Sequence, residues 1–404
     1  MKTSVFLYPW DVVGDPDAAR RIADLGVQQV TLASAYHSTR ALTPRHPRHR
    51  IVTAEHASVL YPVDEARWAG HELRPYAAGA WAPGDAYGEA AAALADAGLE
   101  VHSWVVLAHN SRLGAERPDT SVVNAYGDRY PWAPCIARPA VAAYLVALAA
   151  EAAVRPGAGG TELESCGWYG LAHLHAHDKI GGVGLDEAAQ YLMSLCFCDV
   201  CGAGYAESGV SPEALAAAVR GALRPVWAGS VVGATEAGVA GIEKLLGAEL
   251  AAVTFAWRGG VARTLQESAV AAVRAAARAA GRPDFQVLLH ADPVPYHTGA
   301  NAGVDPAHVL GVADGVVLPC TGGAAARLLP AFTPHAVGSS VLAANFTVVS
   351  GMGGAPGSLE RDASLALTLG ATELRLYHGG LASAEDLAAV SSALSVLSSI
   401  AGRA

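Results

Sequence analysis

Short runs of β-forming residues recur eight times along the chain, and longer Ala-rich runs separate most of them. This alternation favours an α/β fold in which crossover helices join parallel strands. Eight parallel strands are the number that closes a (β/α)8 barrel. We predict the strands at residues 5–8, 29–33, 101–107, 160–165, 285–289, 315–318, 340–346 and 373–377.

A long helical excursion interrupts the alternation after the fourth strand, at about residues 185–281. We predict helices at 185–195 and 212–223, with a cysteine-rich turn between them, and a last Ala-rich helix that ends near Ala280. The stretch 253–256 could form a strand, but the hydrophobic residues around it recur at helical spacing, which favours helix.

The chain has 404 residues, of which 52% are hydrophobic, and this is enough to fill the core of one barrel. We therefore expect a single domain over 1–404. A formal net charge of −10, with no run of Lys or Arg, disfavours nucleic acid as a partner. We find neither a secretion signal nor an apolar stretch long enough to span a bilayer, so we expect a cytoplasmic protein without a membrane partner. We expect no organic cofactor. The sequence leaves the oligomeric state open, and a homo-oligomer is one possibility.

The active site of such a barrel lies at the carboxyl ends of its strands. Aromatic, acidic and imidazole side chains gather there in this sequence. Rings of this kind stack on sugar faces, and the polar groups bond sugar hydroxyls, so we expect a small-molecule or oligosaccharide substrate. The candidate substrate-binding residues are Trp10, Asp11, Tyr36, His37, Trp104, His109, Asn110, Trp168, Tyr169, Asp178, Lys179, His290, His297, Asn345 and Tyr377.

Two glutamates on the fourth strand are the strongest catalytic candidates. Glu162 and Glu164 share one face of the strand because side chains alternate. Their repulsion would raise one pKa and keep that carboxyl protonated, as a glycosidase acid requires. We predict Glu164, nearer the strand end, as proton donor. Glu162 either raises the pKa of Glu164 or is held by a buried Arg or Lys.

Asp292 follows the fifth strand, next to the fourth around the barrel, and is our predicted catalytic partner of Glu164. The spacing of the two carboxyls would decide between retention, at about 5–5.5 Å, and inversion, at about 6.5–9.5 Å. The alternative is that Asp292, which precedes a proline, only starts a turn.

A C-x-C-x-x-C cluster lies inside the helical excursion, at Cys196, Cys198 and Cys201. Structural zinc takes four soft ligands, and zinc held by four thiolates has no open position for catalysis. We choose Cys135 as the fourth ligand and predict structural Zn²⁺ that pins the excursion to the barrel. The alternative is a set of free, buried thiols.

Three alternating histidines, His173, His175 and His177, follow the fourth strand. They suggest a second reaction class, a metal-dependent hydrolase. The alternative is a loop over the site in which one or two of them bond substrate.

The cysteine cluster in its context, C-F-C-D-V-C-G-A-G-Y with an upstream W-A-P-C-I-A-R-P, resembles the zinc cluster of family 42 β-galactosidases. The third-strand stretch W-V-V-L-A-H-N resembles glycosidase-like barrels of that group, and the likeness covers mainly residues 100–205. The resemblance implies a glycoside hydrolase with Cys135, Cys196, Cys198 and Cys201 as zinc ligands and Glu164 as the acid/base residue.

The sequence departs from this family at two positions. Leu163 stands where the family has an Asn before the acid/base Glu. The predicted seventh strand has no carboxylate, whereas the family's nucleophile is a Glu at its end. Either another carboxylate serves (Asp292, Glu162 or Asp178), or the enzyme inverts, or the barrel binds sugar without catalysis.

Overall fold

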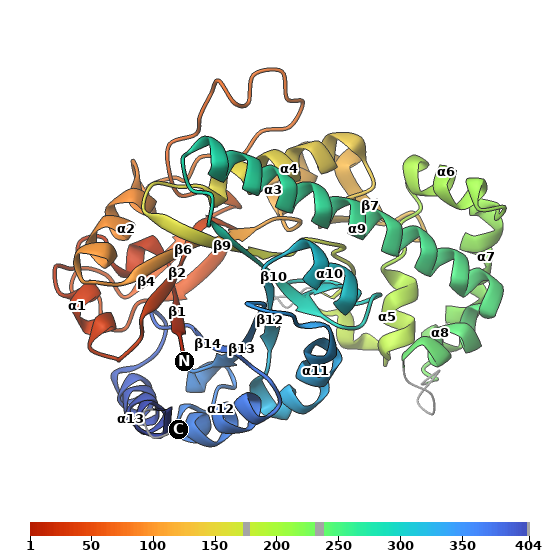
Figure 1. The fold of residues 1–404 in the computed structure, drawn as a ribbon. Coiled ribbons are helices and arrows are strands. Elements are labelled where there is room, and N and C mark those ends of the chain that lie inside the picture. Colours follow the sequence, from red (N-terminus) through yellow and green to blue (C-terminus); the bar gives the residue numbers. More distant parts are fainter. Residues whose placement is uncertain (173–177, 231–237, 402–404) are drawn as a thin grey trace.

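The computed structural model describes residues 1–172, 178–230 and 238–401 (Figure 1). Eight parallel strands pair side by side, and β1 pairs with both β14 and β2, so the sheet closes into a barrel. Each of the eight predicted runs overlaps one observed strand, which confirms the (β/α)8 fold. Around the barrel, the strands are β1 (Thr3–Leu7), β2 (Gln29–Tyr36), β6 (Glu100–Val106), β9 (Ala158–Glu164), β10 (Gln286–Asp292), β12 (Gly315–Pro319), β13 (Val341–Thr347) and β14 (Glu373–Tyr377).

Helices surround the barrel (Figure 1). Their inner faces pack on the outward side chains of the strands in one large apolar core. These helices are α1 (Ala18–Ala23), α2 (Ala86–Asp96), α3 (Ser111–Glu116), α4 (Pro139–Ala153), α10 (Pro306–Val312), α11 (Ala325–Phe332), α12 (Leu359–Thr368) and α13 (Ala384–Ala401). Short 3-10 turns are η1 (Pro9–Asp11), η2 (Pro118–Thr120), η3 (Ile180–Gly182), η4 (Thr321–Gly323), η5 (Thr333–His335), η6 (Ser350–Met352) and η7 (Pro356–Ser358).

The inward side chains follow from strand alternation. Val341 and Ala343 of β13 form a small apolar cluster with Val317 of β12 and Leu288 of β10, separate from the core under the helices. Since every second residue faces the same side, Asn345 faces the barrel interior as well.

The excursion between β9 and β10 consists of α5 (Glu187–Met193), α6 (Asp199–Glu207), α7 (Pro212–Trp227), α8 (Gly238–Leu246) and α9 (Ala248–Ala279). Helices α5 to α8 lie to one side of the barrel, and the long α9 runs from them back to it (Figure 1). The stretch 253–256 lies inside α9, so the choice of helix over strand is confirmed. We did not predict α6 or α8.

Short antiparallel elements were also absent from the sequence prediction. β3 (Thr39–Leu42) pairs with β4 (Ile51–Ala54), and β7 (Ser121–Val123) pairs with β8 (Arg129–Pro134). β5 (Ser58–Val59) pairs with β2 in the same antiparallel sense. The short β11 (Ala302–Gly303) is parallel instead and pairs with the end of β10. Within the described part of the chain, none of the helices is both long and apolar enough to cross a lipid bilayer.

Candidate active site and cysteine cluster

Glu164 is the last residue of β9, and its carboxyl group lies at the carboxyl end of the barrel. Only 8% of the residue is exposed. The indole Nε1 of Trp104 donates a hydrogen bond of 2.8 Å to its Oε2. Burial raises the pKa of Glu164, and this effect outweighs the opposing effects of His290 and Trp104. The environment therefore favours the protonated acid.

The backbone directly after Glu164 is strained. Ser165 has φ 55°, and it is the one residue other than glycine with a positive φ in the described ranges. Its N–H donates to the carbonyl oxygen of Ala300 at 2.8 Å, which fixes the turn. Left-handed conformations of non-glycine residues cost free energy and concentrate at functional sites. The strain marks this strand end as a candidate site.

An aromatic wall surrounds Glu164. The ring of Tyr36 lies 4.6 Å from that of Trp104, and the ring of Tyr377 lies 5.9 Å from it. Tyr8 packs against Tyr36 with 4.9 Å between ring centroids. Burial raises the pKa of Tyr36 and Tyr377, and the neighbouring Glu164 acts in the same direction, so both phenols stay protonated. They can bond a substrate without carrying charge.

The predicted rim residues of strands two to four meet beside this wall. The ring of His109 lies 4.9 Å from His37 and stacks on Tyr169 at 4.5 Å. Asn110 has a structural role in the helix that follows, because its Oδ1 accepts the N–H of Leu113 at the start of α3. The structure thus brings His37, His109 and Tyr169 together.

Glu162 lies deeper in the barrel and is fully buried. Its Oε1 accepts hydrogen bonds from Nε of Arg375 at 2.5 Å and from Thr31 at 3.1 Å. Nε2 of His290 lies 3.3 Å from Oε2. Burial alone would raise the pKa of Glu162, but Arg375 and His290 lower it to about 2. Of the two arrangements expected for Glu162, the structure has the one in which a buried Arg holds the carboxylate.

Asp292 is buried at the end of β10. One carboxylate oxygen accepts from Arg327 of α11 at 3.1 Å, and the other accepts the N–H of Val294 at 2.9 Å. With Tyr296 and the exposed His297, Asp292 lines an open cleft of about 660 Å³. The turn contact and the ion pair give Asp292 one fixed orientation.

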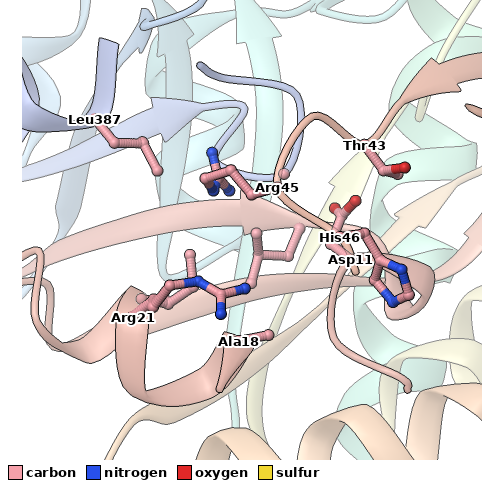
Figure 2. A pocket seen from close by; sticks show the side chains of 10 residues that line it. Asp11, Ala18, Arg21, Thr43, Arg45, His46 and Leu387 are labelled. Carbon is pink, nitrogen blue, oxygen red and sulfur yellow. The ribbon is translucent and has the colours of Figure 1, made fainter. Parts of the chain in front are cut away.

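Trp10 and Asp11 follow β1, as predicted. Trp10 is buried and stacks on Tyr8 at 4.6 Å. The carboxylate of Asp11 accepts the N–H of Tyr8 at 2.8 Å, and burial raises its pKa to about 7. Asp11 lines a cavity of about 20 Å³ together with Arg21 and Arg45, whose side chains approach it from other segments (Figure 2). A cavity of this size holds about one water molecule.

The remaining predicted site residues after strand four lie outside the aromatic wall or outside the described residues. The Trp168 indole donates to the carbonyl oxygen of Arg258 in α9 at 2.9 Å, so it joins the strand end to the excursion. Asp178 and Lys179 are exposed. The candidate metal ligands His173, His175 and His177 lie outside the described residues.

The end of strand seven presents an amide. Asn345 is half-buried, and its Oδ1 is buried without a hydrogen-bond partner among the described residues. The neighbouring strand places Arg375 beside it in register, and Tyr377 beside Thr347. The strand end at which the resemblance implies a nucleophile therefore carries an amide and no carboxylate.

Sequence reasoning missed Arg375, Tyr8 and Arg327. A signal for Arg375 was present, because a charged residue in the middle of the strand sequence E-L-R-L-Y must face either the barrel interior or the helices, and needs a counter-charge in both places. Tyr8 and Arg327 carried no comparable signal.

The four cysteines of the predicted metal site come together and are buried. Sγ of Cys135 lies 3.7 Å from that of Cys198 and 3.6 Å from those of Cys196 and Cys201. A tetrahedral ion with Zn–S bonds of 2.3 Å requires sulfur separations of about 3.8 Å. The N–H of Val123 also points to Sγ of Cys196 at 3.5 Å. The cluster can thus bind a metal ion, with no disulfide among these residues.

No protein-family model and no curated protein match this sequence. Solved structures do match its fold. An α-L-fucosidase (isoenzyme 2) from Paenibacillus thiaminolyticus superposes with a TM-score of 0.57 and 12% identity, over 98% of this chain and 49% of that one. A GH42 β-galactosidase from G. stearothermophilus gives 0.55 and 10%, over 99% and 57%. The catalytic domain of a β-amylase from Paenibacillus polymyxa gives 0.53 and 12%, over 97% of both chains.

The chain thus spans about half the length of the fucosidase and somewhat more of the galactosidase. These neighbours are glycoside hydrolases, so the remote resemblance to family 42 barrels is confirmed at the level of the fold. At such low identity the likeness carries no activity with it.

Proposed function

We propose that this protein is a glycoside hydrolase in which Glu164 donates the proton. The observation that carries the proposal is the buried carboxyl of Glu164 at the end of strand four, hydrogen-bonded to Trp104 inside an aromatic wall. Burial raises the pKa of this carboxyl, which favours the protonated form that glycoside cleavage needs. The glycoside hydrolase neighbours support the same class of reaction.

In this reaction, the proton of Glu164 moves to the glycosidic oxygen as the bond from that oxygen to the anomeric carbon breaks. The carboxylate that remains accepts the Trp104 N–H, which stabilises its charge. The rings of Tyr36 and Tyr169 offer surfaces for a sugar ring, and His37 and His109 offer donors and acceptors for hydroxyls. The substrate class is a small or oligomeric sugar.

Glu162 and Asp292 were predicted as candidates for the second group of the reaction. Glu162 is engaged by Arg375, so it acts in the floor of the site rather than on a sugar. Asp292 as the partner of Glu164 stays a prediction. Its ion pair with Arg327 would keep it in place to activate water, and a carboxyl spacing of about 6.5–9.5 Å would then give inversion.

The test is turnover of a panel of aryl glycosides by the purified protein and by Glu164→Gln. We expect the variant to lose about 100-fold or more in kcat on substrates with poor leaving groups, and less on activated ones. Glu267→Gln, at a surface glutamate that forms an ion pair with His308, is the matched control and should retain activity. Full activity of Glu164→Gln would show that another group is the acid.

A second candidate function is sugar binding without catalysis. The amide of Asn345 at the strand-seven position favours it, because the carboxylate of the related hydrolases is missing there. Binding of a sugar by calorimetry, with no turnover over the whole panel, would establish it. A metal-dependent hydrolase using His173, His175 and His177 would instead lose turnover on chelation without unfolding.

The cysteine cluster is proposed to hold structural Zn²⁺. Thiolate separations of 3.6–3.7 Å fit a tetrahedral ion, and the four ligands leave no open position. Cys135 follows β8, whereas Cys196, Cys198 and Cys201 precede or begin α6, so the ion would fasten the excursion to the β7–β8 hairpin.

A further inference from the structure

The carboxylates around the strand ends are already engaged by other groups. Glu162 bonds Arg375, Asp292 bonds Arg327, and Asp11 accepts from the backbone and faces Arg45. At the end of strand seven, where a nucleophile would stand, the side chain is the amide of Asn345. A reaction with retention would therefore need a nucleophile from elsewhere.

We propose that the substrate supplies it: a glycoside of a 2-acetamido-2-deoxy sugar, whose own acetamido oxygen attacks the anomeric carbon. The inference rests on the proposed function, because it takes Glu164 as the proton donor. Substrate-assisted hydrolysis of this kind needs one enzymic acid and a site that orients the acetamido group, and no second carboxylate nucleophile.

The neutral polar groups at strands seven and eight suit an acetamido group. Asn345 faces the barrel interior, and its buried Oδ1 has no partner in the described part of the chain, so it can accept the acetamido N–H. Tyr377, on the adjacent strand, presents a phenol that can donate to the acetamido carbonyl. One acceptor and one donor on neighbouring strands match the one N–H and one C=O of an amide.

Tyr377 is also placed near the proton donor. Its ring lies 5.9 Å from that of Trp104, the indole that donates a hydrogen bond to Glu164. This phenol is neutral, and the cation nearest to Asn345 in register, Arg375, is compensated by the carboxylates of Glu162 and Glu373. The positive charge that develops on the acetamido carbon therefore meets no uncompensated cation.

The first step balances as follows. The acetamido oxygen forms a bond to the anomeric carbon, the bond from this carbon to the leaving oxygen breaks, and Glu164 gives its proton to that oxygen. The product is a cyclic oxazolinium ion beside a carboxylate. Water then adds to the anomeric carbon, returns one proton to Glu164 and reopens the ring, so the configuration is retained and nothing is oxidised or reduced.

The first experiment compares paired substrates on the wild-type protein. These are 4-nitrophenyl hexosides with 2-acetamido and 2-hydroxyl groups, in gluco and galacto series and both anomers. We expect kcat/KM to favour the acetamido member by at least about 100-fold, since a site built to bond an amide rejects an analogue without it. Equal turnover of the 2-hydroxyl partner would overturn the inference and leave Glu164 as acid intact. No turnover of any glycoside would overturn both proposals.

The second experiment tests which group attacks the anomeric carbon. Fluorination of the acetamido methyl weakens the carbonyl as a nucleophile, so kcat/KM should fall with each fluorine, and NMR of the first product should show retention. A rate unchanged by fluorine, or inverted product, would show that a side chain such as Asp292 activates water.

The third experiment tests the amide recognition. Asn345→Ala and Tyr377→Phe should each lower kcat/KM for the acetamido substrate by about 10-fold or more, the value of one hydrogen bond in a closed site. Tyr126→Phe, at an exposed tyrosine on the β7–β8 hairpin, is the matched control and should change nothing. Equal activity of the two site variants and the control would overturn the assignment.

Discussion

Replacement of Arg375 by Met removes the cation that Glu162 needs inside the barrel. Both side chains are fully buried, and Nε of Arg375 lies 2.5 Å from Oε1 of Glu162. Removal of one partner from a buried ion pair costs about 3–5 kcal/mol, because a buried charge is left uncompensated. The pKa of Glu162 gives a similar size: a value of about 2, against an ordinary 4.5, corresponds to about 3 kcal/mol.

The pH dependence of this loss has a definite sign. In the wild-type protein the folded-state pKa of Glu162 lies below the unfolded value, so its contribution is present above about pH 4.5 and is lost as the pH falls towards 2. In Arg375→Met, burial is no longer offset by the Arg and raises the pKa of Glu162. The variant should therefore be most destabilised at neutral pH and should recover part of the loss on acidification.

The assay is urea unfolding followed by tryptophan fluorescence at pH 7 and pH 5. Arg361→Met, at an arginine whose side chain is 80% exposed and is paired with Asp362, is the control and should cost under about 1 kcal/mol. The double variant Glu162→Met/Arg375→Met should regain most of the loss, since apolar replacement of a whole buried pair is often neutral. Two results would refute the reasoning. One is a loss of unfolding free energy below about 1 kcal/mol for Arg375→Met. The other is a loss in the double variant that equals the sum of the losses in the two single variants.

Three further outcomes can be checked with single variants. Cys198→Ser should lower the melting temperature, and it should lower the metal content, measured by mass spectrometry, below the expected value of about one ion per chain. If both values are unchanged, the thiols bind no ion. Asp11→Asn should flatten the pH dependence of stability between about 4 and 7, because the raised pKa of Asp11 makes the wild type lose on the order of 4 kcal/mol as the pH rises through that range; equal slopes in urea unfolding would contradict it. Trp104→Phe removes the donor that lowers the pKa of Glu164, so the alkaline limb of kcat/KM should move to higher pH and the rate should fall roughly 10-fold; an unmoved limb would show that another group sets it.

The barrel itself could be predicted because its signal is local. β-Forming runs and Ala-rich runs alternate with the periods of strand and helix, and all eight strands were placed from them. The cysteine spacing was equally informative, since C-x-C-x-x-C leaves little choice about where three thiolates point. The short hairpins and α8 were missed because their segments are brief and carry no sustained period.

The state of each candidate side chain could not be predicted because it depends on partners distant in sequence. Arg375 meets Glu162 across 213 residues, and Arg327 meets Asp292 across 35. Asn110 was predicted to bind substrate, and only the course of the following backbone showed that it caps a helix. Registry between strands decides such pairs, and a shift of one residue would turn every side chain to the other face.

Strand four shows why two carboxylates on one face differ in their chemistry. Glu162 and Glu164 lie one strand repeat apart, about 7 Å along the chain. The carboxyl of Glu162 bonds the guanidinium of Arg375, whereas the carboxyl of Glu164 bonds the indole of Trp104. The pKa is lowered at Glu162 and raised at Glu164. Because Arg375 compensates the deeper charge, the pKa of Glu164 is raised mainly by burial and only slightly by repulsion from Glu162. A glutamate pair on a barrel strand is therefore best read together with the cation that a neighbouring strand brings to the deeper member.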